Sequence, residues 1–485
     1  MKHFSKLFLA LFFLLTLFHS CYLMQSSKGG GQKVTVTNRV IKPTDIALPT
    51  GYKIEPVVSG LTFPTGIAFD DSGKLYVIEA GYSYGEVLLQ PKLLKVEGGK
   101  TSVLASGPKN GPWTGIAWYK NAFYVAEGGE MDGGAIIKIT KDGKSRTIIS
   151  GLPSVGDHHT NGPAIKDDYI YFGQGVATNS GVVGEDNYQF GWLKRKRSFR
   201  DIPCEDITLN GENYTTANPL TDDLNDKSIT GAYAAFGTKT NAGQVIKGAI
   251  PCTGSIMRVK LEGGNPELVA WGFRNPFGLT FSPDGRLYIT ENGYDDRGSR
   301  PVWGAGDVLW EVNTGIWYGW PDFSAGKALD KYEEFRPPST KKNVKPLLRD
   351  YPNVPPKPSA IFGVHSSANG LDFSTKDKFG FNGEVFVAEF GDMSPGVGKV
   401  LAPVGFKIVR VNVFNGVIRD FAVNKGKKNG PASQLQTGGL ERPVAVKFSP
   451  DGSALYVVDF GIMKMTEKGP QPQTGTGMIW KISRQ

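Results

Sequence analysis

The chain has 485 residues, a formal net charge of +9 and 40% apolar residues. This length ordinarily suggests two or three domains, and the excess of lysine and arginine raises the question of nucleic-acid binding. The sequence has no zinc-ligand spacing of cysteine and histidine, no G-x-x-x-x-G-K-[ST] loop and no C-x-x-C-H motif. These absences exclude the common zinc, P-loop and attached-haem classes.

The first twenty residues have the pattern of a secretory signal peptide. Lys2 and Lys6 form a charged start, and the apolar run 7–18 is too short to span a bilayer. The run ends in Phe-His-Ser-Cys, which is similar to a bacterial lipoprotein cleavage site with Cys21 as the lipidated residue. An ordinary signal peptide with an incidental cysteine is the alternative. We therefore expect an exported bacterial protein, periplasmic or lipid-anchored to the membrane, with residues 21–50 as a flexible tether.

One sequence pattern recurs six times along the rest of the chain. It consists of a small residue, an apolar strand, a turn and a second strand that leads to a glycine. The copies occupy residues 63–81, 111–129, 161–175, 271–293, 368–391 and 442–461, of which the third is degenerate. An alternating apolar strand follows each copy, but in the third it comes only after a long insertion. Six copies of a four-stranded unit predict an all-β fold, a six-bladed β-propeller.

The two ends of this region predict how the ring closes. Residues 51–60 form a lone strand before the first copy, and residues 477–483 form a lone strand after the last. Pairing both in one blade would remove the exposed edges of the ring. Because a closed ring is one cooperative unit, we expect a single propeller domain over residues 51–485, with an insertion at about residues 176–254.

The insertion contains two cysteines and a basic run. In the oxidising compartment that export implies, Cys204 and Cys252 are predicted to form a disulfide that pins the insertion; two free buried thiols are the alternative. Such a bridge typically contributes about 2–5 kcal/mol. We interpret the basic residues 194–197 as a solvated surface rather than a nucleic-acid site, because the protein is expected to be exported.

Residues suited to chemistry stand just before three of the innermost strands. His158 and His159 precede the third copy, and His365 precedes the fifth. Each is a candidate general base, because imidazole titrates near neutrality, although a loop histidine with an ordinary hydrogen bond is the alternative. Arg274 and Asn275 hold the same place in the fourth blade and suit a planar anion with carbonyl groups. The alternative for Arg274 is hydrogen bonding to loop carbonyls.

The segment after the fourth copy is rich in oxygen donors. Residues 291–299 and Asp307 combine carboxylates, carbonyls and glycines, which suit a hard cation such as calcium. Carboxylates also end the second strand of five copies: Glu79, Glu127, Glu291, Glu389 and Asp459. Their recurrence indicates a structural repeat position rather than one convergent metal site.

The stretch 272–293, followed by Gly306-Asp307 and the motif YGWP at 318–321, resembles the soluble quinoprotein glucose/sorbosone dehydrogenases. The resemblance extends from about residue 51 to residue 482, and its motifs are specific in combination. It implies a six-bladed propeller that oxidises a sugar hydroxyl or hydrated aldehyde with pyrroloquinoline quinone (PQQ) and calcium.

The resemblance also implies roles for individual residues. The family's catalytic base falls on His158, with His159 as the fallback, and its quinone-contacting pair falls on Arg274 and Asn275. Calcium would polarise a quinone carbonyl, and Arg274 would stabilise the negative charge that develops there. The residues implied for calcium are Gly293 and Tyr294, through their carbonyls, and Asp307.

The chain departs from the family pattern at several positions. The place of a quinone-contacting lysine in the fifth blade falls on Gly391, and the aspartate after the third inner strand is replaced by Val176. Arg410 is the candidate to supply one of the missing charges. The second calcium site of the glucose-active members, after YGWP, has no match. These departures concern the substrate and cofactor affinity rather than the fold.

Three classes of function follow: an exported PQQ- and calcium-dependent sugar dehydrogenase, a non-catalytic binding propeller, and a calcium-dependent lactonase-type hydrolase. The missing lysine favours the binding propeller, whereas His158 and Arg274, which a bare scaffold does not need, favour the dehydrogenase. The expected partners are a sugar, an external electron acceptor, since the chain lacks a haem motif, and the membrane through the lipid anchor. Nucleic acid is not expected.

Overall fold

The computed structural model of the chain describes residues 38–81, 89–129, 133–393, 398–466 and 469–485. The predicted signal peptide, the lipidation site Cys21 and most of the predicted tether lie outside these residues. Within the described ranges, no helix combines the length and the apolar composition needed to cross a membrane.

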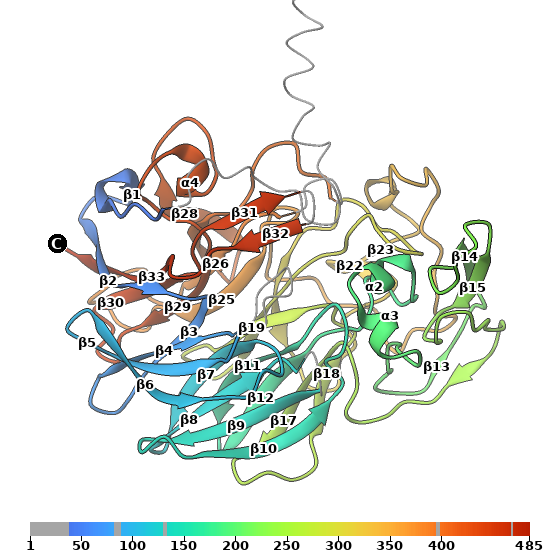
Figure 1. Cartoon of the computed structure of the whole chain (residues 1–485), viewed down its shortest axis with the longest axis horizontal. Helices are drawn as coiled ribbons and strands as arrows, with labels where there is room; N and C mark the ends of the chain where they lie inside the picture. The colour runs from blue at the N-terminus through green and yellow to red at the C-terminus, as the bar shows by residue number, and fades with distance from the viewer. Residues whose placement is uncertain (1–37, 82–88, 130–132, 394–397, 467–468) are drawn as a thin grey trace, which may run out of the picture.

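Six antiparallel sheets are arranged around a central axis as the blades of a propeller (Figure 1). Blades 1 to 3 are β3 (Pro64–Phe69), β4 (Leu75–Glu79), β5 (Lys92–Glu97) and β6 (Lys100–Ser106); β7 (Trp113–Tyr119), β8 (Ala122–Glu127), β9 (Gly134–Thr140) and β10 (Ser145–Leu152); and β11 (Thr160–Lys166), β12 (Tyr169–Gln174), β17 (Ser255–Lys260) and β18 (Glu267–Trp271). The first strand named in each blade lies nearest the axis and contacts the innermost strands of both neighbouring blades.

The other three blades repeat this order. They are β19 (Pro276–Phe281), β20 (Leu287–Glu291), β21 (Val308–Val312) and β24 (Ala360–Ile361); β25 (Ala368–Phe373), β26 (Val385–Glu389), β27 (Lys407–Asn412) and β28 (Val417–Asn424), with β1 (Ile46–Ala47) at its outer edge; and β29 (Pro443–Phe448), β30 (Ala454–Asp459), β33 (Gly477–Arg484) and β2 (Tyr52–Leu61). The predicted six-bladed propeller is confirmed.

The ring is closed in the sixth blade by the two ends of the chain. Strand β33 pairs with β30 on one side and with β2 on the other, and Tyr52 lies opposite Arg484 in the register. The predicted pairing of the terminal strands is therefore confirmed. Each strand covers an edge that the other would expose.

A ring of small residues allows the six innermost strands to approach one another. The third residue of each is glycine or alanine: Gly66, Gly115, Gly162, Gly278, Gly370 and Ala445. A Cβ on Gly115 would lie 2.1 Å from the carbonyl oxygen of Gly162, and one on Gly278 would lie 2.4 Å from that of Asn369. The close approach of the strands around a central channel of about 430 Å³ therefore requires glycine at Gly115, Gly278 and Gly370, whereas Gly66 has more room.

The recurring carboxylates are structural. Each ends the second strand of its blade opposite the first residue of the innermost strand, and in blade 3 a glutamine, Gln174, takes this place. Glu79 accepts a hydrogen bond from the backbone N–H of Thr62 at 2.7 Å, and Asp459 accepts one from that of Arg442 at 2.9 Å. The side chains thus fix the segment that enters each innermost strand, and the predicted structural repeat position is confirmed.

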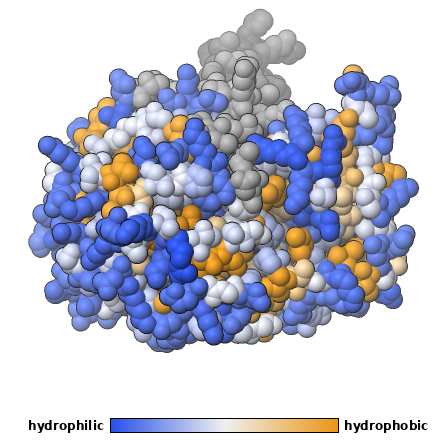
Figure 2. Space-filling view, turned by 60° about the horizontal axis from the view of Figure 1, so that its bottom comes forward, coloured by the Kyte–Doolittle hydropathy of each residue, from blue (hydrophilic) through white to orange (hydrophobic). Residues whose placement is uncertain are grey.

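Apolar side chains fill the space between neighbouring blades. Between blades 1 and 2, Tyr76 and Phe123 pack with ring centroids 4.5 Å apart, and Phe123 is fully buried. The outer surface is different, since Figure 2 shows a face on which polar side chains predominate and apolar ones form small patches.

The insertion between β12 and β17 lies to one side of the ring (Figure 1). It contains α2 (Glu185–Gln189), α3 (Trp192–Arg195), β13 (Ile207–Thr208), β14 (Asn213–Ala217), β15 (Lys227–Gly231) and β16 (Val245–Ile246). The predicted disulfide between Cys204 and Cys252 is present, with an S–S distance of 2.06 Å. All four basic residues at 194–197 are exposed, as expected for a solvated surface.

Candidate active site

The segments that enter the innermost strands of blades 3, 4 and 5 meet at one end of the ring. The backbone of Val176, just after β12, links the first two, because its carbonyl accepts a hydrogen bond from His158 at 3.2 Å and its N–H donates one to Arg274 at 2.9 Å. Asp295, after β20, links the others: its carboxylate lies 2.8 Å from the guanidinium of Arg274 and 3.5 Å from Nε2 of His365. The structure thus brings His158 and Arg274 together, as predicted.

Arg274 is buried, and every nitrogen of its guanidinium group donates a hydrogen bond. Nε donates to the carbonyl of Asn179 at 3.1 Å, and Nη1 donates to the carbonyl of Gly293 at 2.5 Å. Nη2 donates to the side-chain oxygen of Asn179 at 2.9 Å and to Asp295 at 2.8 Å. These partners fit the alternative interpretation, in which Arg274 bonds to loop carbonyls. They also hold the positive charge of Arg274 beside His158.

Asn275 belongs to a chain of amide side chains across blades 3 to 5. Its Nδ2 donates to Oδ1 of Asn292 at 2.8 Å, and its Oδ1 accepts from Nδ2 of Asn161 at 3.3 Å. Asn292 in turn donates to the carbonyl of Ala368 at 3.1 Å. The predicted Asn275 thus lies at the site, in a row of polar groups that follows the ring.

His158 is the group best placed to act as a base. Its Nε2 atom is shielded from solvent and has no hydrogen-bond partner among the described residues. Burial lowers the pKa of His158 well below its usual value, and the positive charges of Arg274 and Arg297 lower it further, against the opposing charge of Asp295. The imidazole is therefore neutral at neutral pH, the form that accepts a proton.

The two other candidate histidines have different neighbours, although Nε2 of His365 is likewise buried without a hydrogen-bond partner among the described residues. His159 lies against blade 2, since a Cβ on Gly128 would be 3.1 Å from its own Cβ. His365 has φ of +59° and lies just before blade 5. Its Nε2 lies 3.5 Å from the carboxylate of Asp295, which Arg274 also contacts. Its ring also packs on Gly398, where a Cβ would be 2.0 Å from Cδ2. His365 therefore belongs to the site, although the family resemblance assigns it no role.

A second arginine, which the sequence did not single out, completes the site. Arg297 donates from Nη2 to Asp157 at 2.8 Å, from Nη1 to Asp186 at 2.6 Å and from Nε to Asp295 at 3.0 Å. Burial disfavours the charge of Asp295, but Arg274 and Arg297 outweigh burial and hold its pKa well below the usual range. Burial raises the pKa of Asp186, which Arg297 opposes. The only sequence signal was the group Asp295-Asp296-Arg297 itself.

The residues implied for calcium do not present a cation site in this arrangement. The carbonyl of Gly293 already accepts from Arg274. Tyr294 is implied through its carbonyl; its buried hydroxyl donates to the carbonyl of Phe323 at 2.9 Å. Asp307 accepts from the N–H of Gly293 at 2.8 Å and, through its other oxygen, from Ser366 and from the N–H of Ala368. Within the described ranges, no group of three histidine, cysteine or acidic side chains is arranged to hold a metal.

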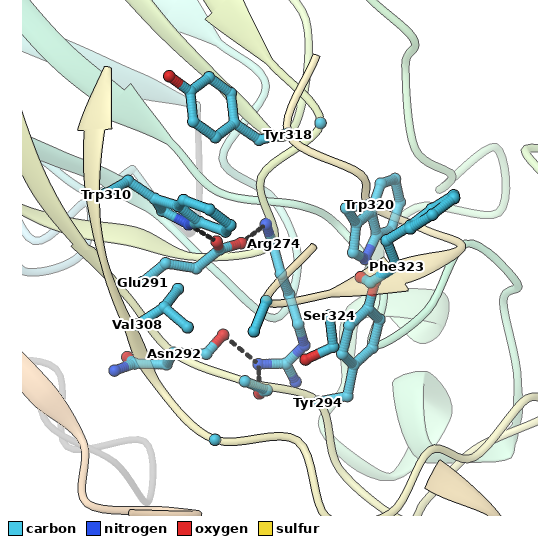
Figure 3. Close-up of a pocket in the computed structure, with 14 residues that line it drawn as sticks. Arg274, Glu291, Asn292, Tyr294, Val308, Trp310, Tyr318, Trp320, Phe323 and Ser324 are labelled. Atoms are coloured by element: carbon cyan, nitrogen blue, oxygen red, sulfur yellow. Dashed lines mark hydrogen bonds between the residues drawn. The ribbon is translucent and has the colours of Figure 1, made fainter. Parts of the chain in front are cut away.

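A cavity of about 20 Å³ lies beside Arg274, between Tyr294, Trp310 and Trp320 (Figure 3). This volume is about that needed for one water molecule. It is too small for a sugar or a quinone, so such a ligand must bind outside it.

Arg410 does not join the site, which corrects the expectation drawn from the missing lysine. It lies in β27 opposite Phe386, pairs with Glu384 and stacks on the ring of Phe381 at 4.0 Å. Its carboxylate and aromatic partners, both on blade 5, hold it away from the segments that enter the innermost strands. Gly391 leaves no room for a lysine, because it has φ of +91° and a Cβ there would lie 2.3 Å from the ring of Phe406.

Residues 234–394 match the model of the Glucose / Sorbosone dehydrogenase family. None of the curated proteins matches the chain in sequence.

Solved structures share the fold. The holo form of the pyranose dehydrogenase PQQ domain from Coprinopsis cinerea is 15% identical, with a TM-score of 0.53 over 90% of this chain and 97% of that chain. The soluble aldose sugar dehydrogenase of Escherichia coli, in its apo form, is 15% identical, with a TM-score of 0.52 over 90% and 100% of the two chains. The iodide structure of the Trichoderma reesei carbohydrate-active enzymes family AA12 is 16% identical, with a TM-score of 0.54 over 93% and 100%.

The chain therefore has the six-bladed propeller fold of these proteins and, over residues 234–394, the sequence pattern of the Glucose / Sorbosone dehydrogenase family.

Proposed function

We propose that this protein is a sugar dehydrogenase that uses PQQ, with His158 as the base. The observation that carries the proposal is the buried, unpartnered Nε2 of His158 beside Arg274. A propeller scaffold does not need such an atom, whereas a base that waits for a substrate hydroxyl does. The family match over residues 234–394 and the PQQ-containing structure with the same fold support the same class of reaction.

The residues at the site suit a planar anion such as PQQ. Arg274 and Arg297 place two guanidinium groups at one end of the ring, each paired with carboxylates, and Asn275 and Asn292 add amide groups along it. Arg274 and Asn275 are the residues that would hold the cofactor. When bound, PQQ supplies the two-electron acceptor for the sugar.

The side chains of the protein then have distinct tasks. Nε2 of His158 takes the proton from the sugar hydroxyl, and the neighbouring arginines keep the imidazole neutral until it does so. Arg274 stabilises the negative charge that develops in the site. Asp295 holds Arg274 and Arg297 at fixed positions by accepting from both guanidinium groups.

The proposal includes calcium only if the site rearranges when the ion binds. A calcium ion at the carbonyls of Gly293 and Tyr294 would require Arg274 to release the Gly293 carbonyl. We therefore assign no step of the reaction to the ion. We also propose that the protein is exported by its first twenty residues, anchored at Cys21 and oxidised by an external electron acceptor.

A binding propeller without catalysis is the second candidate. It is favoured by the complete pairing of Arg274 and by the absence of a lysine at Gly391. A lactonase-type hydrolase has less support, because the recurring carboxylates lie in separate blades, and Glu79, Glu291 and Asp459 accept from backbone N–H groups.

One experiment separates these candidates. Purified protein is titrated with PQQ by absorbance, and dye reduction is followed across a panel of aldoses, pyranoses and lactones, with added calcium or with a chelator. We expect PQQ to bind and an aldose or pyranose to reduce the dye only in its presence. Binding of sugar without dye reduction would favour the binding propeller. Failure to bind PQQ both with millimolar calcium and with chelator would overturn the dehydrogenase proposal.

A further inference from the structure

Arg297 joins three carboxylates that come from three parts of the chain. Asp157 precedes the innermost strand of blade 3, Asp186 lies in α2 of the insertion, and Asp295 follows β20 of blade 4. We propose that Arg297 is a positioning residue with two separable effects: it orients the base His158 through Asp157, and it docks α2 through Asp186 as a wall of the sugar pocket. The inference rests on the proposed function and adds a determinant of sugar size to it.

The first effect acts on the residue next to the base. Asp157 accepts from Arg297 at 2.8 Å through one oxygen and from Nδ2 of Asn187 at 3.2 Å through the other. The backbone of Asp157 donates to the carbonyl of Ala177 at 3.1 Å. Because Nε2 of His158 itself has no partner among the described residues, the direction of its ring depends on how this short segment is held.

The second effect acts on the insertion. Helix α2 has only five residues, too few to be stable without tertiary contacts. Its contacts with the segment after β20 are polar: Asp186 accepts from Arg297 at 2.6 Å, and the carbonyl of Val183 accepts from Ser299 at 3.2 Å. The ring of Phe190 lies 5.3 Å from the guanidinium carbon of Arg297. Tyr188 and Phe190 also pack against the apolar cluster of the insertion, so Arg297 supplies the polar link between α2 and the segment after β20.

The two effects meet beside the base. Asn187 of α2 donates to Asp157, so the helix stands next to the residue that precedes His158. A sugar whose hydroxyl reaches Nε2 of His158 is therefore bounded on this side by the insertion. A shift of α2 would change which sugars fit, and a shift of Asp157 would change how well the base is aligned.

The test uses Asp157→Ala and Asp186→Ala in the full chain, with Glu262→Gln as the matched control. Glu262 pairs with Arg146 at an exposed position. Its substitution removes one carboxylate far from the site. Hydrogen exchange of residues 183–195 is measured in the protein without PQQ. Steady-state kinetics with PQQ then compare a monosaccharide with a disaccharide, and thermal unfolding checks that each variant is folded.

We expect Asp186→Ala to speed exchange in residues 183–195 by about tenfold or more, since the helix loses its dock. The KM ratio between disaccharide and monosaccharide should change by about tenfold, with kcat for the monosaccharide within about twofold of wild type. Asp157→Ala should instead lower kcat by about tenfold for both sugars with little change in KM. Asp157→Asn, which keeps an acceptor, should recover part of that loss, and Glu262→Gln should change none of these quantities.

Unchanged exchange of residues 183–195 in Asp186→Ala would overturn the docking of α2 by Arg297. Equal losses of kcat and of selectivity in both alanine variants would indicate a structural role alone and would overturn the positioning of His158. If wild type oxidises no sugar with PQQ, the proposed function has failed, whereas the exchange measurement still decides whether Arg297 docks the insertion.

Discussion

Blades 2 and 3 have the same order of strands but differ in the segment that joins their second strand to their third. In blade 2 the connection is residues 128–133, and in blade 3 it is residues 175–254, which form the insertion. The end of the second strand does the same structural work in both: Glu127 accepts from Nδ2 of Asn110 at 2.6 Å, and Gln174 accepts from Oγ1 of Thr160 at 2.8 Å.

The two blades differ in the side chains that the segments around these strands add to the site. The insertion of blade 3 supplies Asn179, which holds Arg274, and Asp186, which pairs with Arg297, while the segment before β11 supplies His158. The described residues of the blade 2 connection, 128, 129 and 133, are all glycine and supply none of these groups. The ring thus provides a rigid and nearly uniform support, and the chemistry depends on residues attached to one sector of it. The predictions below test this division between ring and insertion.

The largest expected effect is on turnover and leaves the ring intact. His158→Ala should lower kcat by about a hundredfold to ten-thousandfold, the range for loss of a general base, because Nε2 is the unpartnered atom that takes the proton. PQQ affinity, measured by absorbance titration, should change little. His159→Ala, whose residue lies against blade 2, is the control and should keep most of the activity. Unchanged turnover in His158→Ala would assign the base to another residue.

The disulfide should matter to the insertion more than to the ring. Replacing Cys204 and Cys252 by alanine should cost about 2–5 kcal/mol of stability, because the bridge closes a long loop. The loss should appear as faster proteolysis within residues 175–254, while hydrogen exchange of the blade strands stays close to wild type. Equal loosening of ring and insertion would show that the two are one cooperative unit.

The small residues of the inner strands offer the converse test, one that affects only the ring. Gly115→Ala should destabilise the protein by about 1–3 kcal/mol, because its Cβ would lie 2.1 Å from the carbonyl oxygen of Gly162. Gly66→Ala is the matched control on the next inner strand, where the nearest atoms would be 3.4 Å away. Denaturant unfolding measures both. Similar midpoints for the two variants would contradict the role of the glycine ring.

Much of the fold could be predicted from the sequence, because a blade is specified by local patterns. The strands, the small residue at the third position and the carboxylate at the end of the second strand recur at short, regular spacings, and the pairing of β2 with β33 follows from two strands without other partners. His158 and Arg274 could be placed at one site for the same reason, since both precede innermost strands.

The rest of the site depended on contacts that spacing does not encode. Arg410 looked free to compensate for a missing lysine, but its register in β27 places it beside Glu384. Asp307 resembled a calcium ligand, but both of its oxygens accept from protein groups that join blades 4 and 5. Arg297 was missed because two of its carboxylate partners, Asp157 and Asp186, are far from it in sequence.

The smallest expected effect is a pH dependence that separates the base from the ring. Burial and the two arginines lower the pKa of His158 in the folded protein below its unfolded value of about 6.5. Folding therefore favours the neutral imidazole, and its contribution to stability is fully present above about pH 6.5 and is lost as the pH falls from that value toward the lowered pKa of the folded state. Activity that needs the neutral base should persist further into acid, declining only near the lowered pKa of the folded state. We expect kcat of wild type to stay level from pH 8 to below about pH 6.5 and to fall only as the pH approaches the lowered pKa of folded His158. Over the same acid range, the unfolding midpoint should fall less in His158→Ala than in wild type. A kcat that already falls between pH 8 and 7, with a pKa above 6.5, would contradict a buried base flanked by two positive charges.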